Sequence, residues 1–275
     1  MVKRKLEDLN LLDDFLFGSM VNYPGIGEKF IRELLKVIFG KRFGTLTVVP
    51  QKVYPGTDTD KHGARLDVYI EENVTNNIEN DITVYDVEPD KNIKDVNILP
   101  QRVRFYHAKI DARSLKSGES YRMLKKVIVI MITPYDPFGL NHMIYTIRNK
   151  CEEIPDMQYD DGARTVFLYT KGTEGNPPEE LKQFLHYMEH TTEENATTDN
   201  LRSIHQMVNL VKQDEEVSLQ YMKIFEREEM LIEQGRKEEQ ANTELERQRA
   251  EKEKARADQL EKELQKLKDK LKEFQ

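Results

Sequence analysis

The sequence contains a single cysteine, Cys151, among its 275 residues. One cysteine cannot form an internal disulfide, and it excludes a zinc site built from several cysteines. Nor is there a run of about 18 apolar residues, the length that a transmembrane helix needs. The start of the chain, residues 1–5, is basic but is not followed by the apolar core of a signal peptide. These absences predict a cytoplasmic protein with no membrane partner.

The chain also lacks an overall positive charge, which is the usual mark of a nucleic-acid-binding protein. Its formal net charge is −8, with 33% of residues charged. The distribution is uneven, however, because residues 91–126 carry ten Lys or Arg against three Asp or Glu, whereas residues 127–225 carry eight against sixteen. A local basic stretch can hold phosphates even in an acidic protein. A solvated basic helix is the other interpretation of the same stretch.

Hydrophobic periodicity predicts alternating helices and strands. Apolar residues at helical spacing predict helices within 6–23, 27–39, 101–115, 177–189 and 196–225, with Asp199 as a cap in the last. β-branched and aromatic runs predict strands at 46–53, 63–70, 82–90, 127–133, 143–147 and 165–169. The run at 127–133 is apolar throughout, as expected for a strand buried on both faces. The alternation predicts an α/β fold.

Two acidic residues, Asp67 and Glu88, lie on neighbouring predicted strands. The strands at 63–70 and 82–90 are joined by the polar, Asn-rich segment 71–81, which predicts an antiparallel hairpin with a loop. Asp67 enters the first strand and Glu88 leaves the second, so the carboxylates are expected to meet at the open end. Mg²⁺ is typically bound by one or two such carboxylates. Acidic residues on neighbouring strands can equally be solvent-facing structure.

Three acids alternate at the end of the second strand of this hairpin: Asp86, Glu88 and Asp90. Alternating residues of a strand project from one face, where three carboxylates repel each other unless a cation neutralises them. Pro89 lacks an N–H, so the ladder is expected to end there with the Pro89 carbonyl free as a further metal ligand.

The order of several short motifs resembles a known nuclease family. These motifs are Arg65-Leu66-Asp67, Tyr85-Asp86-Val87-Glu88, Arg102-Val103-Arg104-Phe105-Tyr106-His107 and Tyr135-Asp136-Pro137-Phe138-Gly139. Over about residues 8–225 the chain resembles the PD-(D/E)XK nuclease family transposases, which are related to the recombination-promoting nucleases of bacteria. The resemblance implies a restriction-endonuclease-like core, with a mixed central sheet flanked by helices. It also implies DNA hydrolysis with Mg²⁺, for which Mn²⁺ can substitute.

The resemblance also implies roles for individual residues. Asp67 matches the metal-binding Asp of the family, and Glu88 matches the acid of its E-x-K or E-x-Q element. The third position of that element is Asp90 in this chain, which cannot supply the positive charge of a lysine. Asp90 could be an extra metal ligand or a catalytic base toward a metal-bound water. Alternatively, the site has decayed and the fold serves as a DNA-binding or coiled-coil scaffold.

DNA contacts are expected from the basic stretch of the chain. Arg102, Arg104 and Lys109 are expected to bind phosphates. An arginine guanidinium can donate two parallel hydrogen bonds to phosphate oxygens, and a lysine ammonium attracts the phosphate as a point charge. Ordinary surface charge is the alternative role of these residues. Glu28, in the predicted helix at 27–39, is a weak match to the family's first acidic motif, and a solvated helix face is the other interpretation.

The chain is expected to form three parts: a nuclease-like core at 1–175, a helical subdomain at 176–225 and a charged long helix at 226–275. The last part carries a heptad seam of Ala250, Ala257, Leu260, Leu264, Leu267, Leu271 and Phe274, interrupted by Glu253. A seam of about three to four heptads predicts a coiled coil, and therefore a homo-oligomer, although its upstream part can also be a solvated helix.

A rival metal motif is present in the predicted helix at 177–189. His186, Glu189 and His190 match H-x-x-E-H, a zinc-protease pattern. The apolar face of this helix is formed by other residues, however, and a five-residue pattern arises easily by chance. We therefore favour the Mg²⁺-dependent endonuclease over a zinc protease.

Overall fold

The computed structural model describes residues 4–54, 64–76 and 79–273. The chain divides into two compact units, Met1–Ser218 and Leu219–Gln275. The first unit is an α/β domain, and the second continues the last helix of the chain. The α/β class predicted from the sequence is therefore confirmed.

The first unit is built on an open, mixed, six-stranded sheet with the strand order β1-β2-β3-β4-β6-β5. The strands are β1 Thr45–Tyr54, β2 Ala64–Asn76, β3 Glu79–Pro89, β4 Lys126–Thr133, β5 Ile144–Ile147 and β6 Ala163–Tyr169. Strands β1 to β3 are antiparallel to one another, and β3, β4 and β6 are parallel. The edge strand β5 is antiparallel to β6. The central strand β4 is buried from Val127 to Thr133, as its apolar run predicts.

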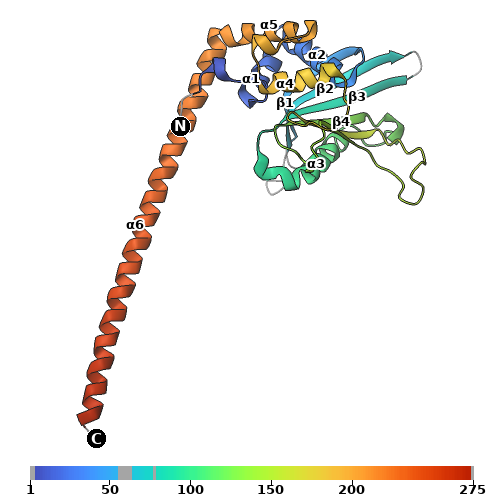
Figure 1. Cartoon of the computed structure of the whole chain (residues 1–275). Helices are drawn as coiled ribbons and strands as arrows, with labels where there is room; N and C mark the ends of the chain where they lie inside the picture. The colour runs from blue at the N-terminus through green and yellow to red at the C-terminus, as the bar shows by residue number, and fades with distance from the viewer. Residues whose placement is uncertain (1–3, 55–63, 77–78, 274–275) are drawn as a thin grey trace. The chain divides into compact units, whose positions relative to one another are not determined.

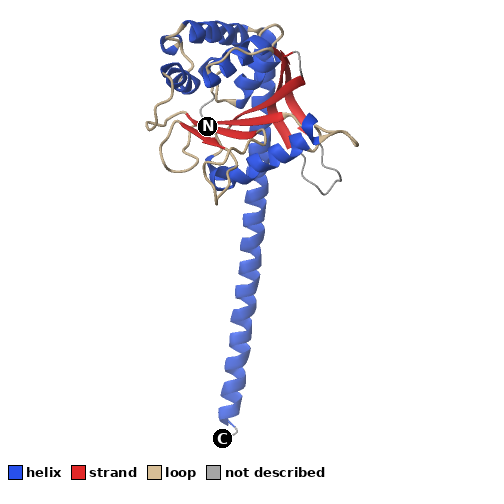
Figure 2. Cartoon of the chain, turned by 90° about the vertical axis from the view of Figure 1, so that its right-hand side faces the viewer, coloured by secondary structure: helices blue, strands red, loops and turns tan. Residues whose placement is uncertain are grey.

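Helices cover both faces of this sheet. The helices of the chain are α1 Asp14–Asn22, α2 Gly27–Phe39, α3 Leu99–Asp111, α4 Glu179–Glu189, α5 Asp199–Gln213 and α6 Glu215–Glu273, with 3-10 turns η1 Leu6–Asp8, η2 Ile93–Ile98, η3 Tyr121–Met123 and η4 Glu193–Asn195. Those of the first unit that cover the sheet are α1 to α5. Helix α3 lies on one face, and α1, α2, α4 and α5 lie on the other (Figures 1 and 2). The α3 face is apolar because Val103 and Ile110 of α3 pack with Val84, Val129 and other strand residues.

The predicted antiparallel hairpin is confirmed, but its predicted loop at 71–81 is wrong. Strand β2 runs on to Asn76 and β3 begins at Glu79, with residues 77–78 outside the described part. The extension is held by Glu72, which is 2% exposed despite its charge. Its carboxylate accepts hydrogen bonds from Lys41 Nζ at 2.9 Å and from the Tyr85 hydroxyl at 2.8 Å. Partners from distant parts of the chain thus stabilise a segment that looks like a loop in isolation.

The segment 6–23, expected to form one helix or two short ones, contains a 3-10 turn and then α1. Two other predicted helix details differ from the structure. Helix α3 ends at Asp111 and is followed by a turn, and does not continue to 115. The cap of α5 is Thr198, whose side chain accepts a hydrogen bond from the Leu201 N–H, so the prediction of Asp199 is wrong by one residue. Helix α2 ends as predicted, because Gly40 adopts the left-handed conformation with φ of 62°.

The second unit is a charged helix. Two seam residues with described side chains, Leu260 and Leu264, are 57% and 53% exposed. The side chains of Leu267 and Leu271, and all of Phe274, lie outside the described residues. None of the described helices combines the length and apolar character that a membrane crossing requires.

Candidate functional site

Asp67 of β2 and Glu88 of β3 lie opposite each other on neighbouring strands. The hairpin register pairs Val68 with Val87, which places Asp67 across from Glu88. The backbone N–H of Asp67 donates a hydrogen bond to Glu88 Oε1 at 2.6 Å. Opposite side chains of an antiparallel pair project from the same face of the sheet. The structure thus brings together the two acids that the sequence singles out.

Asp86 is the third acid of this group and was not chosen as a site residue from the sequence. It precedes Glu88 by two residues, so both project toward the face that α3 covers. Asp86 is fully buried and Glu88 is 4% exposed. In the described part of the chain, neither oxygen of Asp86 has a hydrogen-bond donor. The Glu88 carboxyl is close enough to bond to it, but two carboxyl groups can do so only when one of them is protonated.

Burial makes this acidic cluster, which we define as Asp67, Asp86 and Glu88, hard to ionise. Burial raises the pKa of Asp67 to about 6, with a further contribution from the charge of Asp14. Burial also raises the pKa of Asp86 to about 8, to which the charge of Asp67 adds. For Glu88, burial and then the charges of Asp86 and Asp67 raise the pKa well above its ordinary value. A cation in the cluster would favour the ionised forms.

Asp90 follows β3 directly and is held by three donors. Its carboxylate accepts hydrogen bonds from Arg102 Nη2 at 2.6 Å, from the Asn92 N–H at 2.7 Å and from the Tyr135 hydroxyl at 3.2 Å. Asp90 is 8% exposed. The carboxylate therefore anchors α3 and the end of β4 to the end of β3. The role of metal ligand or base that the sequence suggests for Asp90 stays a prediction.

Arg102 of α3 places a positive charge beside the acidic cluster. Burial alone would lower the pKa of its guanidinium, but Tyr106, Asp90 and Glu88 raise it above the ordinary value. Within the described residues, the Arg102 Nε is buried without a hydrogen-bond partner. A second carboxylate, Asp95, lies 3.7 Å from Arg102 Nη1. Arg102 thus binds carboxylates in this structure, and its contact with phosphate stays a prediction.

Asp14, the first residue of α1, is a neighbour of the cluster that sequence reasoning missed. Burial and then the charge of Asp90 raise the pKa of Asp14, and its own charge raises that of Asp67. The sequence feature that could have indicated Asp14 is the pair of acids at positions 13–14, at the start of a helix rich in apolar residues. Glu28, the weak candidate from the sequence, instead forms an exposed pair with Arg32 at 2.7 Å on α2.

The other predicted residues lie around α3 and at the end of β3. Pro89 is the last residue of β3 and is paired with Ile132 of β4. Arg104 is exposed on α3, and Lys109 Nζ lies 5.0 Å from the centre of the Phe105 ring. Their contacts with DNA stay predictions.

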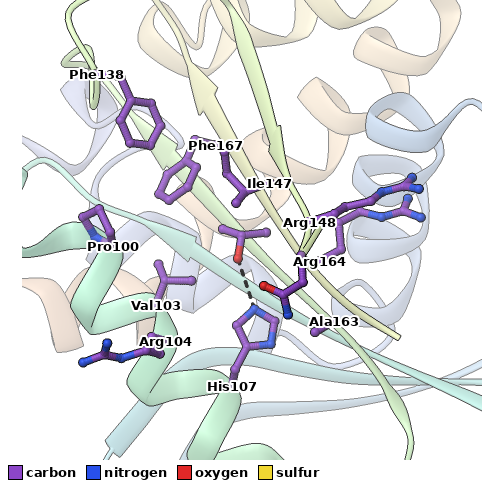
Figure 3. A pocket seen from close by; sticks show the side chains of 12 residues that line it. Pro100, Val103, Arg104, His107, Phe138, Ile147, Arg148, Ala163, Arg164 and Phe167 are labelled. Atoms are coloured by element: carbon purple, nitrogen blue, oxygen red, sulfur yellow. Dashed lines mark hydrogen bonds between the residues drawn. The ribbon is translucent and has the colours of Figure 1, made fainter. Parts of the chain in front are cut away.

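A cavity of about 400 Å³ lies on α3, between that helix and strands β5 and β6 (Figure 3). Its lining residues are Pro100, Val103, Arg104, His107, Phe138, Ile147, Arg148, Asn149, Ala163, Arg164, Thr165 and Phe167. One of these residues, Arg104, is a predicted phosphate contact.

The rival zinc motif does not form a metal site in the structure. The rings of His186 and His190 are 4.9 Å apart at the end of α4. Glu189 accepts a hydrogen bond from the Thr170 hydroxyl at 2.5 Å and pairs with Lys171 at 3.6 Å. These contacts are structural, and they leave the acidic cluster as the candidate metal site.

The acidic cluster fits a cation that takes few protein ligands. Across residues 4–54, 64–76 and 79–273, no three His, Cys, Asp or Glu side chains are arranged to hold a metal ion by themselves. Mg²⁺ usually binds through one or two carboxylates and fills its other positions with water and phosphate. The buried oxygens of Asp86 without a donor, beside Asp67 and Glu88, match this requirement.

No family model, curated protein or solved structure matches the chain.

Proposed function

We propose that this protein is a Mg²⁺-dependent DNA endonuclease of the transposase or recombination-promoting type, acting in the cytoplasm. The observation that carries the proposal is the meeting of Asp67 with Glu88 beside the buried Asp86, whose oxygens have no donor in the described residues. Buried carboxylates of this kind are stabilised by a divalent cation. The mixed sheet with helices on both faces supports a restriction-endonuclease-like core.

In this proposal, Asp67, Glu88 and the Pro89 carbonyl hold Mg²⁺, with Mn²⁺ as a substitute. When bound, the metal polarises the phosphate and lowers the pKa of its water. Arg102 supplies the positive charge that Asp90 cannot supply, because Asp90 holds its guanidinium beside Glu88. A fixed cation there stabilises negative charge that develops on the phosphate. Asp90 thus acts as a positioning residue for Arg102.

DNA would be held by the basic stretch that includes α3. Arg104 and Lys109 contact phosphates in this proposal, and residues 91–126 carry ten Lys or Arg against three Asp or Glu. Phosphate contacts release counterions, so DNA binding should weaken steeply with salt and depend little on sequence.

The decisive experiment is cleavage of supercoiled plasmid with Mg²⁺ or Mn²⁺ by the purified full chain. We expect nicking by the wild type and none by Asp67→Asn or Glu88→Gln, with unchanged circular dichroism. Matched controls are Asp199→Asn, whose side chain is fully exposed, and Glu28→Gln in its exposed pair. Full nicking by both cluster variants would reject the proposal.

A catalytically decayed nuclease fold that acts as a DNA-binding or coiled-coil scaffold is the second candidate. Two points favour it: Asp90 stands where the resemblance places a lysine or glutamine, and the seam residues Leu260 and Leu264 of α6 are exposed. DNA binding by the wild type, with no cleavage under either metal, would support the scaffold over the endonuclease.

A further inference from the structure

The cavity beside α3 has apolar walls suited to a flat ring. Phe138 and Phe167 pack edge to face with ring centres 5.0 Å apart, and Val103 and Ile147 add aliphatic surface. Phe138, Phe167 and Ile147 lie together at one end of the cavity (Figure 3). A volume of about 400 Å³ falls within the range of small-ligand pockets. These walls would stack on an aromatic ligand without selecting among similar rings.

The opposite end of the cavity is lined by polar side chains, His107 and Thr165. His107 lies away from Phe138 in Figure 3, and its Nε2 is 3.1 Å from the Thr165 hydroxyl oxygen. Its Nδ1 is buried and has no hydrogen-bond partner among the described residues. Burial lowers the pKa of His107, which favours the neutral ring with one donor and one acceptor nitrogen.

Three cationic side chains are among those that line the cavity. Arg104 is exposed on α3, and Arg148 and Arg164 extend side by side on the β5–β6 side (Figure 3). Burial and then the charge of Arg148 lower the pKa of Arg164, so the two guanidinium groups repel each other. The local positive potential favours a ligand whose ring carries a phosphate group.

We propose that this cavity binds one unpaired nucleobase of a DNA strand. Because the rings of Phe138 and Phe167 are perpendicular, one contacts the base with its face and the other with its edge. The His107–Thr165 pair bonds the polar edge of the base, and Arg104 contacts the adjoining phosphate. The shared chemistry is a purine or pyrimidine ring attached to a phosphate, which a free mononucleotide also carries. The inference rests on the proposed endonuclease function and adds a preference for unpaired DNA.

Helix α3 connects the cavity to the acidic cluster. Arg102 and Tyr106 of this helix interact with the cluster carboxylates, whereas Val103, Arg104 and His107 line the cavity. A helix with its side chains is about 10–12 Å across. The acidic cluster and the cavity are therefore about one helix width apart. A single DNA strand whose phosphate lies at the acidic cluster can place a nearby base in the cavity.

The test is binding of fluorescein-labelled single-stranded and duplex DNA to the full chain in EDTA, followed by anisotropy. We expect His107→Ala and Phe138→Ala to weaken single-strand binding at least tenfold and to leave duplex binding unchanged. The matched control is Phe105→Ala, because Phe105 on α3 is 37% exposed and Phe138 is 38% exposed. Equal single-strand binding by the wild type and both cavity variants would overturn the inference.

Two further arms keep the result decisive. The imidazole signals of wild-type protein are followed by NMR while single-stranded DNA and, in a separate titration, thymidine monophosphate are added, which needs no variant. Movement of the His107 signal supports a base in the cavity, and an unmoved signal at saturating single-stranded DNA overturns it. Binding of free mononucleotides without single-stranded DNA would assign the cavity to a free nucleotide instead. The wild type should bind single strands in EDTA, where the proposed metal-dependent cleavage cannot occur, so loss of cleavage and loss of base binding are separable.

Discussion

Arg102 on α3 donates a hydrogen bond of 2.6 Å to Asp90, the residue that stands where the family resemblance places a lysine or glutamine. Asp90 therefore binds a positively charged side chain that helix α3 supplies. Because Glu88 also raises the pKa of Arg102, the guanidinium lies within the electrostatic reach of the acidic cluster. The relationship supplies a physical reason why Asp90 need not exclude catalysis.

A double-mutant cycle on Asp90 and Arg102 should show strong coupling. The side chains are 9% and 24% exposed, and hydrogen bonds to charged groups contribute about 1.5–3 kcal/mol to stability. We expect Asp90→Asn and Arg102→Met to be coupled by about that amount in urea unfolding. The exposed pair Asp199 and Arg202 is the control and should show no measurable coupling. Additive effects at Asp90 and Arg102 would contradict the positioning role.

The metal-free protein should lose stability as the pH rises from about 4 to about 8. Asp86 has a folded pKa of about 8 against an ordinary value of 3.8, and Asp67 has one of about 6. In this window the folded state holds protons that the unfolded state has released, so unfolding becomes easier with increasing pH. Asp86→Asn should flatten the slope measured by thermal unfolding in EDTA, whereas Asp199→Asn should keep it. An unchanged slope in Asp86→Asn would contradict the assignment.

Divalent cations should stabilise the folded protein more at pH 8 than at pH 5.5, because protons compete for the same carboxylates. At a hundredfold excess over the dissociation constant, the gain would be about 2.7 kcal/mol. Mn²⁺ should therefore raise the Tm of the wild type and of Glu28→Gln. Asp67→Asn should lose most of this shift, and an equal shift in that variant would place the metal elsewhere.

Self-association should depend on the seam of α6. Leu260 and Leu264 expose apolar surface that a second copy of the helix would cover. Leu260→Glu combined with Leu264→Glu should give monomers by sedimentation velocity and leave the Mn²⁺ shift in Tm intact. Asn242→Glu combined with Ala255→Glu is the control, since neither position belongs to the seam. If the seam variant forms the same oligomer as the wild type, self-association does not occur through a coiled coil of α6.

Several elements of the fold follow from local patterns in the sequence. Helix α2 is determined by apolar residues at helical spacing and a glycine that takes the left-handed conformation at its end. Strand β4 is determined by an unbroken apolar run. The hairpin was also predictable, and with it the approach of Asp67 to Glu88, because alternation fixes which side chains share a face.

The extent of the hairpin and the surroundings of the cluster were not predictable in this way. The Asn-rich end of β2 is a strand because Lys41 and Tyr85 bind Glu72. Asp14 joins the neighbourhood of Asp67 because α1 packs near the end of the hairpin. Such contacts join residues far apart in the chain, and no local period encodes them.

The sequence by itself determined the order of helices and strands and the pair of carboxylates that meet on β2 and β3, because both follow from short-range periodicity. Only the tertiary structure decided that Asp90 binds Arg102, that Asp86 is buried without a donor, and that α3 borders both the acidic cluster and a cavity. These three depend on how α3 packs on the sheet, which is set by the shapes of many apolar side chains together.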